Sequence, residues 1–249
     1  GSLLAYQISE GGSDWRKVIV LDAETKEQVE DTLMDVKFSG TSWRGNEGFY
    51  YSSYDKPKEG SQLSGMTDKH KLFWHTLGTP QSEDKLIFGG METPRRYIGG
   101  GVTEDEKYLI ISAATSTTGN ELYIQDLSIP NAPIKTVVGN FENDHNIIHS
   151  EGKTLYIKTN LDAPNGKVVT TSVDALGTEN WKDLIPETEN VLSIGSAGGK
   201  FFATYMIDAT DKVFQYDLEG NMEHEIDLPG LGSAGGFGGR MEDTVLYYS

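Results

Sequence analysis

The sequence has 249 residues, and its 21 Lys and Arg residues stand against 38 Asp and Glu residues, for a net charge of −17. It contains no cysteine, which excludes disulfide frameworks, thiolate nucleophiles and Cys-ligated zinc sites. It also lacks the clustered Lys and Arg that bind phosphate groups, which argues against nucleic acids and anionic membrane surfaces as partners. Its longest apolar runs fall far short of the roughly 20 residues of a membrane helix. These features predict a soluble protein, either cytoplasmic or periplasmic.

Short runs rich in aromatic and β-branched residues recur along the chain and predict β-strands. The first series of runs occupies residues 3–6, 48–51, 108–111, 154–157, 201–204 and 244–247. Successive members lie about 45, 60, 46, 47 and 43 residues apart, close to the repeat of four-stranded propeller blades except at the second step. A second series follows in phase, at residues 17–22, 71–78, 121–127, 167–174 and 212–218. The agreement of the two series predicts an antiparallel repeat.

Each repeat is completed by an inner and an outer strand. Glycine suits the inner strand, because blades crowd together near a propeller axis. The inner strands are predicted at residues 98–103, 192–198 and 232–238, and the outer strands at 85–88, 134–138, 223–228 and the second half of 24–36. The expected fold is therefore an all-β propeller of four-stranded antiparallel blades, with about five blades, as a single domain over residues 1–249. The long second period contains a polar insertion at residues 55–70, expected to be a mobile loop.

The phase of the repeat raises the question of how the first and last blades are completed. The chain begins and ends at the second strand of a blade, which would leave unpaired strand edges. Either five repeats close a ring, with the closing blade taking its inner strand from residues 232–238, or the chain is an arc of a larger ring. A second copy of the chain could also complete the ring.

Three segments resemble the propeller domain of the prolyl oligopeptidases, also called prolyl endopeptidases. They are residues 12–15 (Gly-Ser-Asp-Trp), residues 36–39 (Val-Lys-Phe-Ser) and residues 71–84, where the pattern His-x-Leu-Gly-Thr-x-x-Ser-x-Asp is the most specific. The resemblance implies a propeller truncated from the family's seven blades. It also implies an α/β-hydrolase catalytic domain, absent from this chain, as the partner, and short peptides cleaved after proline as the substrates.

The same resemblance implies site residues. Phe38 matches an aromatic residue that projects toward the substrate cleft, although a core phenylalanine is the alternative. Asp14, with the adjacent Trp15, matches an interdomain contact, whereas a solvated turn is the alternative for the carboxyl group. Ile98 and Thr117 fall where the family places further substrate-lining side chains. A propeller arginine of the family is replaced here by alanine at position 114.

No catalytic residue is predicted. The Gly-x-Ser-x-Gly motif that presents the nucleophile of an α/β-hydrolase is missing, since Ile194 and Leu231 stand where Ser196 and Ser233 would need glycine. We therefore expect a gating domain that is inactive by itself. A stand-alone propeller that binds a protein, and an enzyme with its active site in the propeller, are the alternatives. No cofactor is expected.

Metal binding is also not expected. His145 and His149 have a metal-binding spacing only on a helix. On a strand they would point to the same face but lie far apart.

Overall fold

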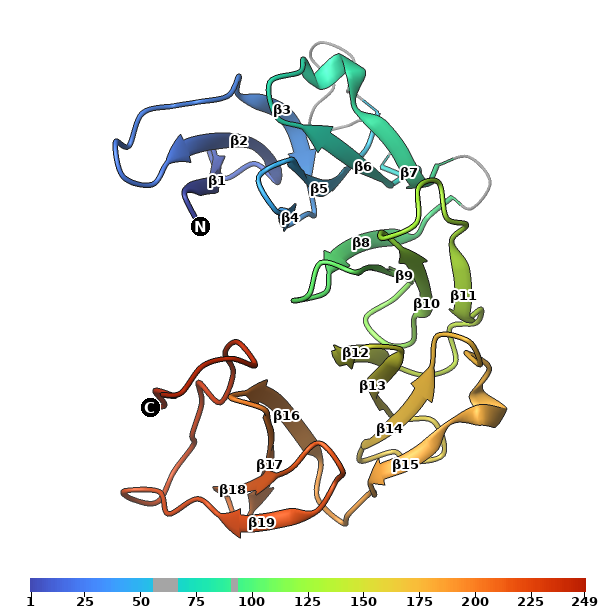
Figure 1. The fold of residues 1–249 in the computed structure, drawn as a ribbon, viewed down its shortest axis with the longest axis vertical. Coiled ribbons are helices and arrows are strands. Elements are labelled where there is room, and N and C mark those ends of the chain that lie inside the picture. The colour runs from blue at the N-terminus through green and yellow to red at the C-terminus, as the bar shows by residue number, and fades with distance from the viewer. Residues whose placement is uncertain (56–66, 91–93) are drawn as a thin grey trace. The chain divides into compact units, whose positions relative to one another are not determined.

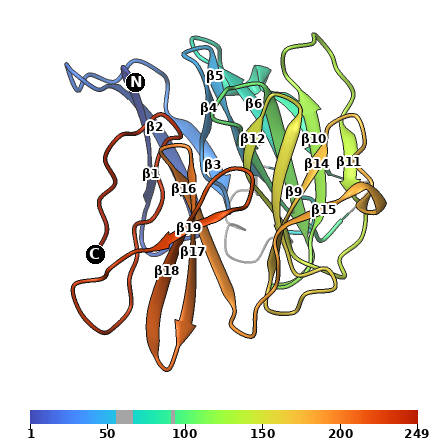
Figure 2. The same ribbon diagram turned by 60° about the horizontal axis from the view of Figure 1, so that its bottom comes forward.

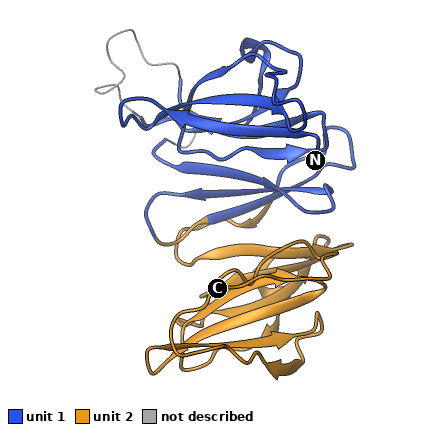
Figure 3. Cartoon of the chain, turned by 90° about the vertical axis from the view of Figure 1, so that its left-hand side faces the viewer, with its two compact units in different colours: residues 1–117, 121–135 blue, residues 118–120, 136–249 orange. Residues whose placement is uncertain are grey.

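The computed structural model describes residues 1–55, 67–90 and 94–249, which form nineteen β-strands and two short 3-10 helices. The predicted insertion at 55–70 lies mostly outside the described residues. The chain divides into two compact units, one of residues 1–117 and 121–135 and the other of residues 118–120 and 136–249 (Figure 3). The strands form five antiparallel sheets, four of them four-stranded and the first three-stranded (Figure 1). The all-β prediction is confirmed.

In the first three sheets, the strands lie in the order in which they occur along the chain. The first contains β1 (Leu3–Ser9), β2 (Trp15–Asp22) and β3 (Leu33–Lys37). The second contains β4 (Ser42–Arg44), β5 (Gly48–Ser53), β6 (Lys71–Thr76) and β7 (Lys85–Gly89), with the 3-10 helix η1 (Gln81–Glu83) before its last strand. The third contains β8 (Tyr97–Val102), β9 (Tyr108–Ala114), β10 (Glu121–Asp126) and β11 (Lys135–Val138). The expected outer strand in the second half of residues 24–36 is confirmed by β3.

The last two sheets repeat this order. One contains β12 (His145–Glu151), β13 (Thr154–Thr159), β14 (Lys167–Ser172) and β15 (Lys182–Ile185), with the 3-10 helix η2 (Thr178–Asn180) before β15. The other contains β16 (Leu192–Ala197), β17 (Lys200–Ile207), β18 (Thr210–Tyr216) and β19 (Met222–Glu225), which lie side by side in Figure 2. Each of the five sheets thus comes from one continuous stretch of sequence.

Strand β5 shows why this repeat forms a core. All six of its residues are buried, because both faces of the strand are covered. Phe49 and Tyr51 on one face pack with Val18, Val20, Leu33 and Val36 of the first sheet. Tyr50 on the other face packs with Ile98, Leu109 and Ile111 of the third sheet. Alternating side chains therefore join neighbouring sheets of the first unit face to face.

Two of the predicted strands do not form, although their residues are described. Residues 232–238 and 244–247 have no strand assignment, and Figure 2 shows this C-terminal part as coil. Leu231 and Tyr247 are largely exposed. A glycine-rich segment has few side chains to bury and loses much entropy when it is ordered. The prediction of an inner strand at 232–238 was wrong for this reason.

The glycine-rich segment is nevertheless attached to β16 of its own unit. The amide of Gly239 donates to the carbonyl of Ser196 at 3.0 Å, and reciprocal bonds of 2.9 and 3.0 Å join Gly235 and Ser249. A Cβ on Gly195 would lie 1.8 Å from the carbonyl oxygen of Phe237, so only glycine permits this approach. Phe237 itself is buried against Phe202.

The prediction that His145 and His149 would point to the same face of a strand was wrong, because β12 contains a bulge. The register of β12 against β13 shifts between Ile147 and His149. His145 pairs with Thr159 and His149 with Tyr156, and these partners are three residues apart on β13. Residues an odd number apart on a strand face opposite sides, so the two histidines do so as well.

Candidate functional site

The candidate site is built around Phe38, which follows β3 directly. Its backbone φ is +51°, in the left-handed region that a bulky residue adopts only at a cost of roughly 1–2 kcal/mol. Bonds from β5 hold this turn, since the Ser53 hydroxyl donates to the carbonyl of Asp35 and the Ser52 amide donates to the Ser39 hydroxyl at 2.6 Å. The Phe38 side chain is 45% exposed. Strain of this kind is typical of positions with a functional role.

Four aromatic side chains form what we call the aromatic surface: Trp15, Phe38, Tyr54 and Tyr97. The Phe38 ring lies edge-to-face with Tyr97, with the ring centroids 5.6 Å apart, and with Tyr54 at 6.3 Å. Trp15 meets Tyr54 at 6.4 Å. Tyr97 is 52% exposed, whereas Tyr54 is buried. The exposed part of this surface offers ring faces and edges that suit an apolar side chain or a proline ring.

A lysine supports the same surface. The Lys37 ammonium lies 4.9 Å from the centre of the Trp15 ring and 5.0 Å from that of Phe38. It also forms an ion pair with the Asp14 carboxylate at 3.8 Å. The lysine is buried while most of the Asp14 side chain is exposed. A cation over two rings stabilises their arrangement by about 0.5–2 kcal/mol, and Asp14 remains accessible from solvent.

Burial keeps the polar groups under the rings neutral. Desolvation raises the pKa of Tyr54 to about 12. Desolvation also lowers the pKa of His70, whose ring centroid lies 4.6 Å from that of Tyr54. Both groups therefore carry no charge near neutral pH. The polar groups in contact with the rings of the aromatic surface therefore include two that are uncharged, Tyr54 and His70.

The structure brings together three of the five residues expected at the site. Asp14, Trp15 and Phe38 lie around the Lys37 ammonium. The Ile98 side chain is fully buried in the core of the first unit, so this residue adjoins the surface through its backbone. Thr117 is exposed in the bend that follows β9. The roles assigned to these five residues stay predictions.

Four residues of the site were not singled out by the sequence: Lys37, Tyr54, His70 and Tyr97. Tyr54 and His70 stand at the two ends of the predicted insertion, and Lys37 and Tyr97 are neighbours of Phe38 and Ile98. An aromatic or histidine at the boundary of an insertion is the one signal that could have indicated them. Their convergence depends on pairing between strands far apart in the sequence.

The motif at residues 75–84 serves the core rather than the aromatic surface. Nδ1 of His75 lies 2.8 Å from the Asp84 carboxyl group, which also accepts a bond of 2.6 Å from the Tyr51 hydroxyl. On the other side, Nε2 of His75 is 3.8 Å from the carboxyl group of Glu30. All these groups are buried. The motif is thus a polar network that joins the loop before β3 to the second sheet.

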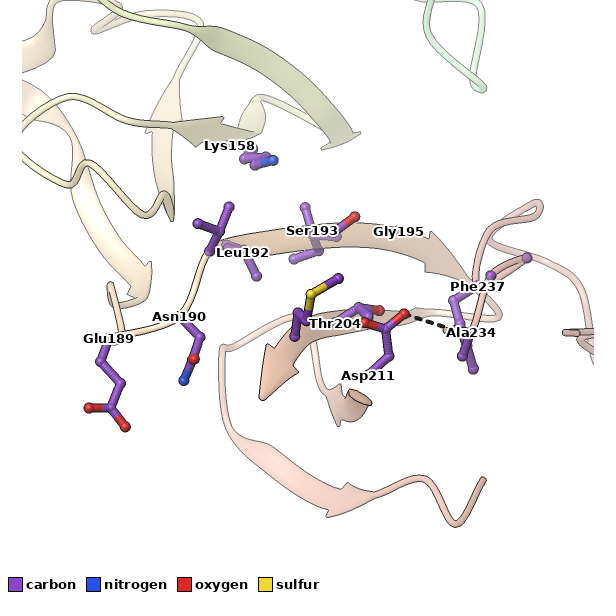
Figure 4. Close-up of a pocket in the computed structure, with 15 residues that line it drawn as sticks. Lys158, Glu189, Asn190, Leu192, Ser193, Gly195, Thr204, Asp211, Ala234 and Phe237 are labelled. Atoms are coloured by element: carbon purple, nitrogen blue, oxygen red, sulfur yellow. Dashed lines mark hydrogen bonds between the residues drawn. The ribbon is translucent and has the colours of Figure 1, made fainter. Parts of the chain in front are cut away.

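The second unit contains a cavity of about 790 Å³ beside β16 (Figure 4). Its lining comes from β16 and β17, including Ser193 and Thr204, and from the glycine-rich segment. Its Asp211 carboxyl group accepts a hydrogen bond of 2.8 Å from the amide of Ala234, drawn as the dashed line in Figure 4. That carboxyl group therefore anchors a loop. None of the residues predicted from the sequence to form a site lies here.

Two other features are absent from the part of the chain that the structure describes. In the ranges 1–55, 67–90 and 94–249, no group of three or more His, Asp or Glu side chains is placed to hold a metal ion. Nor do these ranges contain a helix with the length and hydropathy required to cross a bilayer.

Comparison with known proteins shows the family. Residues 1–249 match the family described as the prolyl oligopeptidase N-terminal β-propeller domain. The chain is 57% identical over 249 residues to a prolyl endopeptidase of Elizabethkingia meningoseptica, covering 100% of this chain and 35% of that protein. It is 31% identical over 245 residues to prolyl oligopeptidase A of Galerina marginata, covering 89% of this chain and 33% of that protein.

Solved structures that resemble this chain come from the same family. Prolyl oligopeptidase B of Galerina marginata, bound to a 35mer hydrolysis and macrocyclization substrate, matches with a TM-score of 0.90 and 26% identity, over 100% of this chain and 36% of that one. A prolyl endopeptidase structure matches with a TM-score of 0.89 and 31% identity over the same shares. The chain spans about a third of the length of the relatives it matches. It therefore belongs to the prolyl oligopeptidase family and corresponds to that family's N-terminal β-propeller domain.

Proposed function

We propose that this chain is the non-catalytic, substrate-filtering domain of a serine peptidase that cleaves short peptides after proline. In this proposal it covers an α/β-hydrolase catalytic domain and admits only short peptides to the nucleophile. The observation that carries the proposal is Phe38, a half-exposed ring held in a strained left-handed conformation by bonds from β5. The absence of a Gly-x-Ser-x-Gly motif from the sequence supports a role without catalysis.

In the proposed arrangement the aromatic surface contacts the peptide, and its edge contacts the catalytic domain. Phe38 and Tyr97 provide the two most exposed rings, which suit an apolar or proline side chain. Asp14 remains open to a basic side chain of the catalytic domain even while it pairs with Lys37, because its carboxylate is mostly exposed. Trp15 lies behind it, against the same lysine.

The test uses the protein in which this chain is joined to its catalytic domain, with a proline-containing fluorogenic peptide as substrate. Phe38→Ala is expected to raise KM about tenfold and to change kcat less than about twofold, because a contact made equally in the ground and transition states is lost. Tyr6→Ala is the matched control, since Tyr6 is a similarly exposed ring on β1 outside the aromatic surface. Equal kinetics for the two variants would contradict the role of Phe38.

A second measurement tests the absence of catalysis. The purified chain alone is incubated with the same peptide, and no turnover is expected. Inhibitor-sensitive cleavage by this chain would overturn the proposal in favour of an active site in the propeller. If the gene encodes no hydrolase after this chain, the stand-alone protein-binding propeller becomes the better interpretation.

A further inference from the structure

His70 lies at the centre of the aromatic surface but contributes nothing to its exposed area. The residue is 1% exposed and directly precedes β6. Its ring contacts two of the four aromatic side chains, with centroid distances of 4.6 Å to Tyr54 and 6.3 Å to Tyr97. Its own carbonyl oxygen accepts a bond of 3.1 Å from the amide of Gly90, which fixes the backbone at this position.

The two ring nitrogens of His70 have partners of opposite kind. Nδ1 lies 2.8 Å from the backbone nitrogen of Ile98, whose N–H can only donate, so Nδ1 must hold a lone pair. Nε2 lies 2.9 Å from the carbonyl oxygen of Lys37, which can only accept, so Nε2 must carry the proton. The contacts thus select the neutral imidazole with its proton on Nε2. Desolvation lowers the pKa of His70 and favours the same neutral form.

The two bonded backbone groups adjoin the two exposed rings. The carbonyl of Lys37 belongs to the peptide group that leads into Phe38. The amide of Ile98 belongs to the peptide group that follows Tyr97. One imidazole therefore bridges the peptide next to each ring, and those rings are 5.6 Å apart. Fifty-eight residues of sequence lie between Phe38 and Tyr97, and the imidazole of His70 joins their two backbone segments directly.

We propose that His70 is the positioning residue of the aromatic surface: as a neutral imidazole bridging Lys37 and Ile98, it holds Phe38 against Tyr97. The importance of this for peptide binding rests on the proposed function. The bridge itself does not depend on that function, because Lys37, His70 and Ile98 all belong to the first unit. A histidine that only fills the core would instead tolerate any replacement of similar volume.

Two isosteric replacements separate these roles. Asparagine at position 70 keeps an acceptor near the place of Nδ1 but has no donor that reaches Lys37. Glutamine places its amide nitrogen near the position of Nε2 and keeps the donor. His70→Asn is therefore expected to release Phe38, and His70→Gln is expected to retain it in part. His145→Asn is the matched control, because His145 is also a buried histidine with a bonded ring nitrogen, in the second unit.

The experiment is nuclear magnetic resonance of the isotope-labelled 249-residue chain. In the unmodified protein, the imidazole ¹⁵N resonances of His70 are expected to show a protonated Nε2 and an unprotonated Nδ1. Cross-relaxation between the rings of Phe38 and Tyr97 is expected in the unmodified chain and in the His145→Asn control. This signal should be lost in His70→Asn and partly restored in His70→Gln.

Three outcomes would overturn the inference. These are a proton on Nδ1, a charged ring at neutral pH, or an unchanged Phe38–Tyr97 signal in His70→Asn. If His70→Asn does not fold, the protonation pattern of the unmodified chain and the His70→Gln signal still decide the question. None of these readouts needs a substrate, whereas the kinetics of Phe38→Ala need one. A failure of the positioning role is therefore distinguishable from a failure of the proposed function.

Discussion

Replacing Asp84 by alanine tests the assignment of the 75–84 motif to the core. The Asp84 carboxyl group is 3% exposed and accepts bonds from two donors, Nδ1 of His75 and the Tyr51 hydroxyl. Alanine leaves both donors buried without this acceptor, and each such loss costs about 1–3 kcal/mol. We therefore expect Asp84→Ala to lower the free energy of unfolding by about 2–6 kcal/mol, a large share of the typical 5–15 kcal/mol of a folded domain.

Asp84→Asn is expected to lower the free energy of unfolding by less than Asp84→Ala does, because its amide oxygen still accepts one of the bonds. Asp174→Ala is the matched control. Asp174 forms an ion pair of 2.7 Å with Lys153, but its side chain is 61% exposed, so the loss should be at most about 1 kcal/mol.

Urea unfolding, followed by tryptophan fluorescence and far-ultraviolet circular dichroism, measures these changes. Trp15, Trp43 and Trp74 lie in the first unit and Trp181 in the second, so fluorescence reports mainly on the unit that contains Asp84. If the units unfold separately, only the transition of the first unit should move. A loss for Asp84→Ala no larger than that for Asp174→Ala would refute the network as a source of stability.

Two further predictions concern the glycine-rich segment and pH. Gly195→Ala should displace the segment 230–249 from β16 and speed its cleavage by a protease, because the new Cβ would lie 1.8 Å from the Phe237 carbonyl oxygen. Gly238→Ala is the control, since the space around its Cβ is open. Equal rates of cleavage for the two variants would contradict the close approach at Gly195. Burial lowers the pKa of His70 and His145, so the unfolded chain takes up protons first as pH falls below roughly 6.5. The free energy of unfolding should therefore decline between pH 7 and pH 5, by at most about 1.4 kcal/mol per pH unit for each histidine. Urea titrations at several pH values should show a shallower decline for His145→Asn, and an unchanged pH dependence would be evidence against its lowered pKa.

The strand repeat was predictable because it depends on local sequence. Alternating apolar residues, as in Leu109, Ile111 and Ala113 of β9, mark a strand with one face toward the core, and all three are buried. The inner strands β4 and β12 were harder to predict, since they contain no glycine. The motif at 75–84 and the segment around Phe38 were sufficient to indicate the family.

Other features depend on contacts between distant segments. The strand expected at 232–238 does not form, because glycine residues supply backbone but little surface to bury. The bulge in β12 reverses the side of the strand on which His149 lies, and a one-residue shift of register leaves no mark in the spacing of the histidines.

By itself, the sequence determined an all-β repeat, the family and Phe38 as a candidate for the site, because strand periodicity and short motifs are written in neighbouring residues. Only the tertiary structure placed Lys37, Tyr54, His70 and Tyr97 around Phe38. Their contacts join residues that strand pairing and sheet packing bring together from distant parts of the chain. The proton on His70 is decided in the same way, since its place depends on two backbone groups, one at residue 37 and one at residue 98.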